Sequence, residues 1–288
     1  DEFKFVDRGS PVGVKTTFIS TAAGDPHSFH IKGSTSRFST IDDSVVINNK
    51  KVLIKVNDST SSVKYNAASF PVGGYSPGLM QLLLIRRWKA TGAPKTISLL
   101  PTGAVSISMH GKDTVQVQGK PEVWQCYVIS GLIWGNEIVW LDEQDNLVCL
   151  ITNDAEGDKL EMMRTEYEEA LPQLISRAAG IGMELFTAST NMDLSKKKTI
   201  AILGGTVVDV VNGATIPNAT VVIEDGKIKT VGASGFVSVP EGASIIIANG
   251  KTILPGLWDM HAHFEQAEWG PAYLAAGVTT VRDCGNEF

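Results

Sequence analysis

The stretch Pro255-Gly-Leu-Trp-Asp-Met-His-Ala-His-Phe264 decides how the C-terminal part of this sequence is interpreted. It places His261 and His263 two residues apart, at the end of the apolar run from Ile253 to Met260. If the run is a β-strand, its side chains alternate between two faces, so both imidazoles project from the same face. Neutral imidazole is a common ligand of zinc and similar ions. The stretch therefore predicts a strand that carries two ligands of a metal site.

Length and composition indicate a globular chain of about two domains. The 288 residues exceed one typical domain of roughly 100–200 residues. The net charge of -6 argues against a nucleic-acid partner, because no basic stripe is present to neutralise phosphates. No apolar stretch approaches the roughly 20 residues that cross a bilayer, so we expect no membrane span. The sequence begins at Asp1 without a methionine, and we expect a processed product.

The three cysteines match neither a disulfide pattern nor a metal-binding motif. Cys126, Cys149 and Cys284 are odd in number and widely spaced, which disfavours a set of disulfides and a CxxC metal knuckle. Cys126 and Cys149 lie in apolar, strand-like runs and are predicted to be buried free thiols. A bridge between two of the three in an oxidising compartment remains an alternative.

The other histidines have no partners in sequence that would suggest a metal site. His27 and His30 lie in a polar, serine-rich region, and His110 precedes Gly111 in an expected turn. We predict that all three are solvated or locally hydrogen-bonded.

Residues 1–187 predict an antiparallel, sheet-rich α+β domain. The pattern favours a helix over Leu79 to Trp88, preceded by the cap-like pair Ser76-Pro77, and a second helix within Thr165 to Phe186 that Pro172 starts or kinks. A polar turn from Glu143 to Asn146 separates two apolar runs, as in a hairpin. The expected strands are Val45–Val56, Thr114–Gln118, Trp124–Ser130, Ile138–Asp142 and Leu147–Ile151.

Residues 188–198 are polar and are predicted to be a linker, followed by a small β-sandwich over residues 199–255. Asp225-Gly226 is a strong hairpin signal between two of its strands. The expected strands are rich in Val, Ile and Thr and cover 199–203, 206–211, 219–224, 227–231 and 244–248.

Four motifs follow one another between Thr199 and Asp283: Ile202-Leu-Gly-Gly-Thr-Val-Val-Asp209, Val222-Ile-Glu-Asp-Gly-Lys-Ile228, Gly250-Lys-Thr-Ile-Leu-Pro-Gly-Leu-Trp-Asp-Met-His-Ala-His263 and Gly277-Val-Thr-Thr-Val-Arg-Asp283. With these motifs the sequence resembles the opening of the amidohydrolase superfamily, and its imidazolonepropionase-like and prolidase-like members in particular. An HxH pair alone is a weak signal, whereas these motifs in this order are specific.

The resemblance implies a small β-sandwich beside a metal-dependent (β/α)₈ TIM barrel, of which residues 256–288 would be the truncated start. It implies that His261 and His263 bind Zn²⁺ or another divalent metal, as one or two ions. Asp259 is expected to orient an imidazole, and Asp283 to lie near the pocket, although a structural ion pair is an equal alternative for Asp283. The further ligands of the family have no match here, since only 25 residues follow His263.

The expected function is therefore that of the N-terminal part of a metal-dependent amidohydrolase. Such an enzyme hydrolyses an amide, cyclic amide or peptide-type C–N bond in a small molecule through metal-activated water. We expect this chain alone to be inactive, and a second chain or a homo-oligomer is one way to complete the barrel. The alternative is a non-catalytic binding or structural module with a groove for an apolar ligand or partner in residues 1–187. The N-terminal domain resembles extensions of exported bacterial amidohydrolases, which favours an exported or periplasmic location over the cytoplasm.

Overall fold

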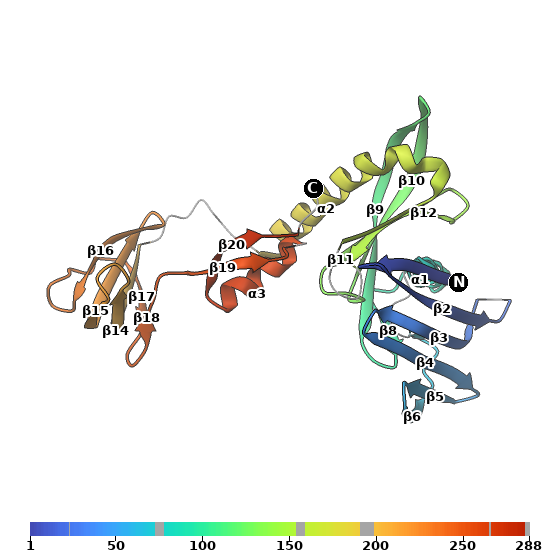
Figure 1. The fold of residues 1–288 in the computed structure, drawn as a ribbon, viewed down its shortest axis with the longest axis horizontal. Helices are drawn as coiled ribbons and strands as arrows, with labels where there is room; N and C mark the ends of the chain where they lie inside the picture. Colours follow the sequence, from blue (N-terminus) through green and yellow to red (C-terminus); the bar gives the residue numbers. More distant parts are fainter. Residues whose placement is uncertain (23, 73–77, 154–158, 191–198, 265, 286–288) are drawn as a thin grey trace. The chain divides into compact units, whose positions relative to one another are not determined.

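The computed structural model divides the chain into two compact units. It describes all residues except 23, 73–77, 154–158, 191–198, 265 and 286–288. The first unit contains Asp1–Leu185 together with the short segment His263–Trp269. The second contains Phe186–Ala262 and the chain from Gly270 on. Figure 1 labels the elements of both units, and each unit is described by itself below.

The first unit begins with a six-stranded antiparallel sheet in which each strand pairs with the next (Figure 1). Its strands are β1 (Glu2–Asp7), β2 (Ser10–Ser20), β3 (Pro26–Ser36), β4 (Ser39–Asn48), β5 (Lys51–Val56) and β6 (Ser59–Lys64). The prediction of one strand over Val45–Val56 was wrong, because that stretch is the β4–β5 hairpin. Asn49 reverses the chain there with φ of 53°, a left-handed conformation that asparagine tolerates well.

A seven-stranded sheet follows, in the order β13-β12-β11-β10-β9-β8-β7. All of its pairings are antiparallel except that of β7 with β8. The predicted hairpin around Glu143 to Asn146 joins β11 to β12, as expected. The strands are β7 (Ser69–Pro71), β8 (Ile97–Leu100), β9 (Ala104–Val117), β10 (Lys120–Ser130), β11 (Asn136–Leu141), β12 (Leu147–Asn153) and β13 (Lys159–Met163).

Two helices pack against this second sheet, one on each face. Helix α1 (Leu79–Ala90) covers the stretch predicted to be helical, whereas its expected cap Ser76-Pro77 lies outside the described residues. A 3₁₀ turn, η1 (Thr165–Ala170), leads into α2 (Leu171–Thr190), and Pro172 stands at the start of α2 as predicted.

Apolar side chains alternate between the two faces of the second sheet, so each face contributes to a separate hydrophobic core. One core joins the first sheet, α1 and the second sheet, and its members include Phe29, Leu84 and Val139. The other core lies between the opposite face of the second sheet and α2, around Trp124 and Trp140. The first unit therefore has the sheet-rich architecture with few helices that the sequence predicted, with the second sheet as its middle layer.

The second unit contains a five-stranded mixed sheet in the order β16-β15-β14-β17, with β18 also paired to β14. The strands are β14 (Ile200–Asp209), β15 (Ala214–Glu224), β16 (Lys227–Ala233), β17 (Ser244–Ile247) and β18 (Thr252–Ile253). The turn at Asp225-Gly226 joins β15 to β16 as predicted, with φ of 52° and 75°. The expected break between residues 203 and 206 is a bulge within one strand, because β14 continues through it to pair with both β15 and β18. The described residues form one sheet here, whereas the predicted sandwich requires two that face each other.

A parallel β–α–β unit ends the described chain. Strand β19 (Leu257–Ala262) pairs in parallel with β20 (Val278–Asp283), and η2 (Ala267–Trp269) and α3 (Gly270–Ala275) lie between them in sequence. Gly256 permits this pairing, since a Cβ atom there would lie 2.0 Å from Oγ1 of Thr279. This close approach explains the glycine of the Pro255-Gly256 step before β19.

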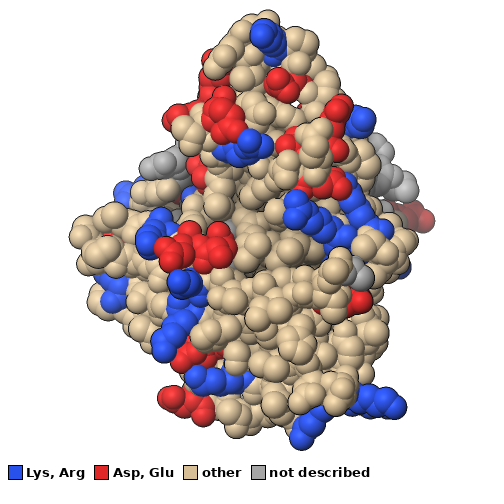
Figure 2. Space-filling model, turned by 90° about the vertical axis from the view of Figure 1, so that its right-hand side faces the viewer, with Lys and Arg blue, Asp and Glu red and all other residues tan. Residues whose placement is uncertain are grey.

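Charges of both signs are mixed on the surface. Figure 2 shows acidic and basic side chains interspersed over the face that it draws. Within the first sheet, Lys4 pairs with Glu2 and Lys55 pairs with Asp42, each at 2.9 Å. Among the described residues, no helix has the length and apolar character needed to span a bilayer.

Candidate metal centre and its surroundings

The two histidines of the HxH motif lie at the C-terminal end of β19. His261 is the penultimate residue of the strand, and His263 directly follows its last residue, Ala262. Both histidines are exposed, whereas the Ala262 between them is buried at 2% exposure. This alternation is the one that projects two imidazoles to the same side of a strand.

Asp259 contacts the backbone of the strand. Its Oδ1 accepts a hydrogen bond from the backbone N–H of His261 at 3.1 Å. This contact fixes the main chain at the residue that bears the first imidazole. The predicted orientation of an imidazole by Asp259 stays a prediction.

Asp283 is the last residue of β20, in register with Ala262 of β19. The pairing brings Asp283 beside the residue that separates the two histidines. Its Oδ1 accepts a hydrogen bond from the backbone N–H of Gly285 at 3.2 Å. Because β19 and β20 are parallel, Asp283 ends its strand at the same edge as the HxH pair.

The residues present fit a divalent metal in kind and supply part of a coordination shell. Imidazole nitrogens suit zinc and related ions, and two of them end the same strand. In the described part of the chain, no group of three or more His, Cys, Asp or Glu side chains is placed to hold a metal ion. A zinc site normally has three or four protein ligands, so a metal-binding role of the two histidines stays a prediction.

The segment after the HxH motif packs within the first unit, against the start of β11. Oε1 of Gln266 accepts a hydrogen bond from the backbone N–H of Asn136 at 3.1 Å, and its Nε2 donates to Oδ1 of Asn153. Gly135 makes room for this side chain, because a Cβ atom there would lie 2.0 Å from Oε1 of Gln266. Gln266 is thus held by two strands of the second sheet.

Two further contacts hold the same segment. The rings of Trp134 and Trp269 stack with centroids 5.9 Å apart, and Nε1 of Trp269 donates to the carbonyl oxygen of Trp134 at 3.1 Å. Oε1 of Glu268 accepts a hydrogen bond from Nδ2 of Asn136 at 2.6 Å. Glu268 thus contacts the second sheet, whereas Glu265 lies outside the described residues.

Two of the other histidines, His30 and His110, have local partners. His30 lies on β3, with Nε2 3.0 Å from Oδ1 of Asp42, and hydrogen bonds from His30 and Lys55 hold the pKa of Asp42 below its usual value. The prediction that His110 lies in a turn was wrong, because β9 continues through it. A register shift in the β9–β10 pairing, near Gly111 with φ of 96°, accommodates the glycine within the strand. Nε2 of His110 lies 3.2 Å from Oε2 of Glu184.

The cysteine predictions are confirmed for the two internal residues. Cys126 and Cys149 are free and fully buried, and burial raises the pKa of each thiol to about 12. Cys284 is free and exposed. No disulfide joins any two of the three.

Glu137 is a buried carboxyl group that sequence analysis missed. It lies on β11 with no exposed surface, and its Oε1 accepts hydrogen bonds from Nε2 of Gln81 at 2.6 Å and from Oγ1 of Thr152 at 2.8 Å. Burial raises the pKa of Glu137 to about 7, against the opposing effect of these two hydrogen bonds. Its position in the sequence could have indicated this burial. Glu137 stands two residues before Val139 and four before Leu141, so all three side chains lie on one face of a buried strand.

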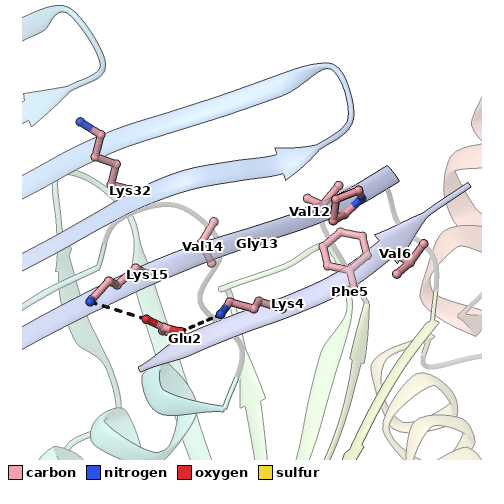
Figure 3. Close-up of a pocket in the computed structure, with 10 residues that line it drawn as sticks. Glu2, Lys4, Phe5, Val6, Val12, Gly13, Val14, Lys15 and Lys32 are labelled. Carbon is pink, nitrogen blue, oxygen red and sulfur yellow. Dashed lines mark ion pairs between the residues drawn. The ribbon is translucent and has the colours of Figure 1, made fainter. Parts of the chain in front are cut away.

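The first sheet also carries a surface pocket of about 520 Å³ over β1 and β2 (Figure 3). Phe5, Val12 and Val14 supply apolar side chains to it. At one end, Glu2 pairs with Lys4 at 2.9 Å and with Lys15 at 3.5 Å, as the dashed lines in Figure 3 mark. The pocket is the kind of apolar surface that the binding-module alternative requires.

Comparison with known proteins gives relatives for part of the chain. It is 38% identical over 79 residues to an adenine deaminase of Paracoccus denitrificans, covering 27% of this chain and 13% of the relative. It is 45% identical over 67 residues to a dihydroorotase of Pelotomaculum thermopropionicum, covering 23% and 15%. It is 30% identical over 99 residues to an enamidase of Eubacterium barkeri, covering 31% and 26%.

Among solved structures, molinate hydrolase matches with 36% identity over 32% of this chain and 25% of that chain, at a TM-score of 0.27. No family model matches the chain. The chain spans between 13% and 26% of the length of the three curated relatives, which fits a match to one portion of longer proteins. Since adenine deaminase, dihydroorotase and enamidase are all amidohydrolase-superfamily members, the resemblance of this chain to that superfamily is confirmed.

Proposed function

We propose that this chain carries the N-terminal part of a metal-dependent amidohydrolase that hydrolyses an amide, cyclic amide or peptide-type C–N bond in a small molecule. The observation that carries the proposal is the HxH pair at the C-terminal end of β19, which is followed by a parallel partner strand. The names of the relatives support it, because adenine deaminase, dihydroorotase and enamidase all act on C–N bonds.

In this proposal, His261 and His263 hold Zn²⁺ or another divalent metal, as one or two ions. When bound, such a metal lowers the pKa of a coordinated water toward neutrality and polarises the scissile carbonyl group. Asp259 keeps the backbone of His261 in place through its 3.1 Å hydrogen bond. Asp283 lies at the same strand edge, which in this proposal borders the substrate pocket.

The proposal also requires further strands and ligands. A two-stranded sheet is at best marginally stable alone, and apolar side chains of β19 are exposed: Trp258 at 69% and Met260 at 50%. We propose that additional parallel strands, from more of the same protein or from a second chain, cover these side chains and supply the remaining ligands. The chain described here is then inactive by itself.

The alternative function is a binding module in the first unit. The apolar pocket of Figure 3 favours it, since Phe5, Val12 and Val14 would contact an apolar ligand or partner there. The two functions differ in their dependence on metal. We further propose that the protein is exported, which fractionation of the producing cells would test.

The test is native mass spectrometry with elemental analysis of the longest form of the protein that the producing cells make. We expect the wild type to contain a bound divalent metal. Metal content should fall in His261→Ala and in His263→Ala. It should not change in the matched control His27→Ala, because His27 is an exposed histidine on β3. Hydrolysis assays on amide, cyclic amide and dipeptide substrates should lose activity in the same two variants. Metal content equal to wild type in both variants would refute the proposed ligands.

A further inference from the structure

The first unit contains a cavity beside Glu137 that is partly open to solvent. Its volume is about 180 Å³, and it lies between α1, the ends of β7 and β8, and the segment that joins β10 to β11. Exposed Thr102 and Gly103 line one side of it. Its apolar walls are formed by Val72, Met80, Leu99, Leu132 and Ile133.

Glu137 is one of the residues that line this cavity, and one oxygen of its buried carboxyl group is unsatisfied. Oε1 accepts hydrogen bonds from Gln81 and Thr152, whereas Oε2 is buried and has no hydrogen-bond partner. When Glu137 is ionised, it carries a buried negative charge, and its Oε2 accepts no hydrogen bond. The neutral group carries its proton on Oε2, since Oε1 already accepts two hydrogen bonds, and that proton has no acceptor. Either form lacks a partner at Oε2, which is costly for a buried polar atom.

Gln81 is held so that it supports this arrangement. Its Oε1 accepts a hydrogen bond from the backbone N–H of Gly78 at 2.7 Å, which leaves its Nε2 to donate to Glu137 at 2.6 Å. Thr152, on the neighbouring strand β12, donates from the other side at 2.8 Å. Both donors favour the ionised form of Glu137 and fix its orientation.

The cavity is larger than a single bridging water requires. Five of its wall side chains are apolar, whereas those of Gln81, Thr102 and Glu137 are polar. A ligand with an apolar body and one polar end matches this mixture.

We propose that this cavity is a binding site for a small primary alkylammonium ion, whose ammonium group donates a hydrogen bond to Oε2 of Glu137 and whose alkyl chain contacts the apolar walls. A cation offsets the buried negative charge, which a neutral alcohol does not do. Anions are disfavoured by the carboxylate. The ligand thus matches the site in charge, in hydrogen bonding and in apolar surface.

Access to Oε2 requires a small movement of the walls, because this atom exposes less than 1 Å². Met80 is the most flexible wall side chain, and its unbranched thioether adopts new rotamers easily. The exposed residues Thr102 and Gly103 mark the side from which a ligand enters.

The test measures binding of n-butylammonium to the full chain by saturation-transfer NMR titration, with 1-butanol as the neutral probe of similar shape. We expect saturable binding of n-butylammonium in the millimolar range or tighter, and binding of 1-butanol weaker by on the order of tenfold or more. Glu137→Gln keeps the size of the side chain and removes its charge, and it should weaken n-butylammonium to the level of 1-butanol. Circular dichroism checks that the variant folds.

A second variant keeps the inference testable if Glu137→Gln does not fold. Thr102→Trp places a large side chain at the exposed side of the cavity without altering Glu137, and it should also reduce binding of n-butylammonium. Gln118→Trp, at an exposed turn between β9 and β10, is the matched control and should bind as the wild type does. Wild-type protein without saturable binding, or binding unchanged in a folded Glu137→Gln or in Thr102→Trp, would overturn the proposal.

Discussion

Replacing Glu137 by glutamine should change how the stability of the first unit depends on pH, in favour of the variant as the pH rises. The pKa of Glu137 is about 7 in the folded protein and 4.5 as the reference for the unfolded chain. Between these two values the folded state keeps a proton that the unfolded state has lost. The free energy of unfolding therefore falls as pH rises through this window and levels off above pH about 7.

The magnitude follows from the size of the pKa shift. A shift from 4.5 to about 7 corresponds to about 3 kcal/mol, since one pKa unit is about 1.4 kcal/mol. Glutamine has no proton to lose, so the variant lacks this contribution. Its carbonyl oxygen still accepts from Gln81 and Thr152, and its amide N–H groups, like the proton of neutral Glu137, have no acceptor at the Oε2 position. As pH rises from 4.5 to about 7, the wild type should lose about 3 kcal/mol of unfolding free energy relative to the variant.

Urea unfolding followed by tryptophan fluorescence measures this difference at pH values below, within and above the window. The buried Trp124 and Trp140 report on the unit that contains Glu137. Glu122→Gln on β10 is a matched control, because Glu122 is partly exposed and the substitution removes the same charge. Parallel curves of free energy against pH for wild type and Glu137→Gln would refute the assignment of a proton to Glu137 at neutral pH.

Three further outcomes test other parts of the structure. Trp140→Ala should lower the free energy of unfolding by about 3–5 kcal/mol in urea titrations, because it empties a fully buried site and removes a hydrogen bond to Asp113; a loss below 1 kcal/mol would contradict that packing. Gly135→Ala should speed proteolysis between residues 263 and 270, since its Cβ would collide with Gln266, whereas Gly92→Ala, which has positive φ but open space, should not. Cys284 should react at once with a thiol reagent in mass spectrometry and the two buried cysteines only on unfolding; equal rates would contradict their burial.

Local patterns were sufficient to predict many elements. The hairpin between β11 and β12 follows from two apolar runs around a polar turn, and the β15–β16 hairpin follows from Asp225-Gly226. These features depend on residues close together in the sequence, where turn chemistry and alternation act directly. The position of His261 at the end of a strand was predictable for the same reason.

Other features depend on contacts between distant residues and were missed. The strands β1 to β3 were not predicted individually, yet they form half of the first sheet. Gln81 and Glu137 are 56 residues apart, and nothing local indicates that one donates to the other. The docking of Gln266 beside Asn136 spans 130 residues. Sequence patterns report which face a side chain occupies, whereas its partner depends on how the elements pack.

The segment between the HxH motif and α3 packs within the first unit through contacts of three side chains. Gln266 and Glu268 hydrogen-bond to Asn136, and the ring of Trp269 stacks on that of Trp134. Contacts from three side chains of one short segment restrict its conformations more than a solvated loop allows. Gly135 leaves the space that the Gln266 side chain occupies, so the glycine and this segment fit one another.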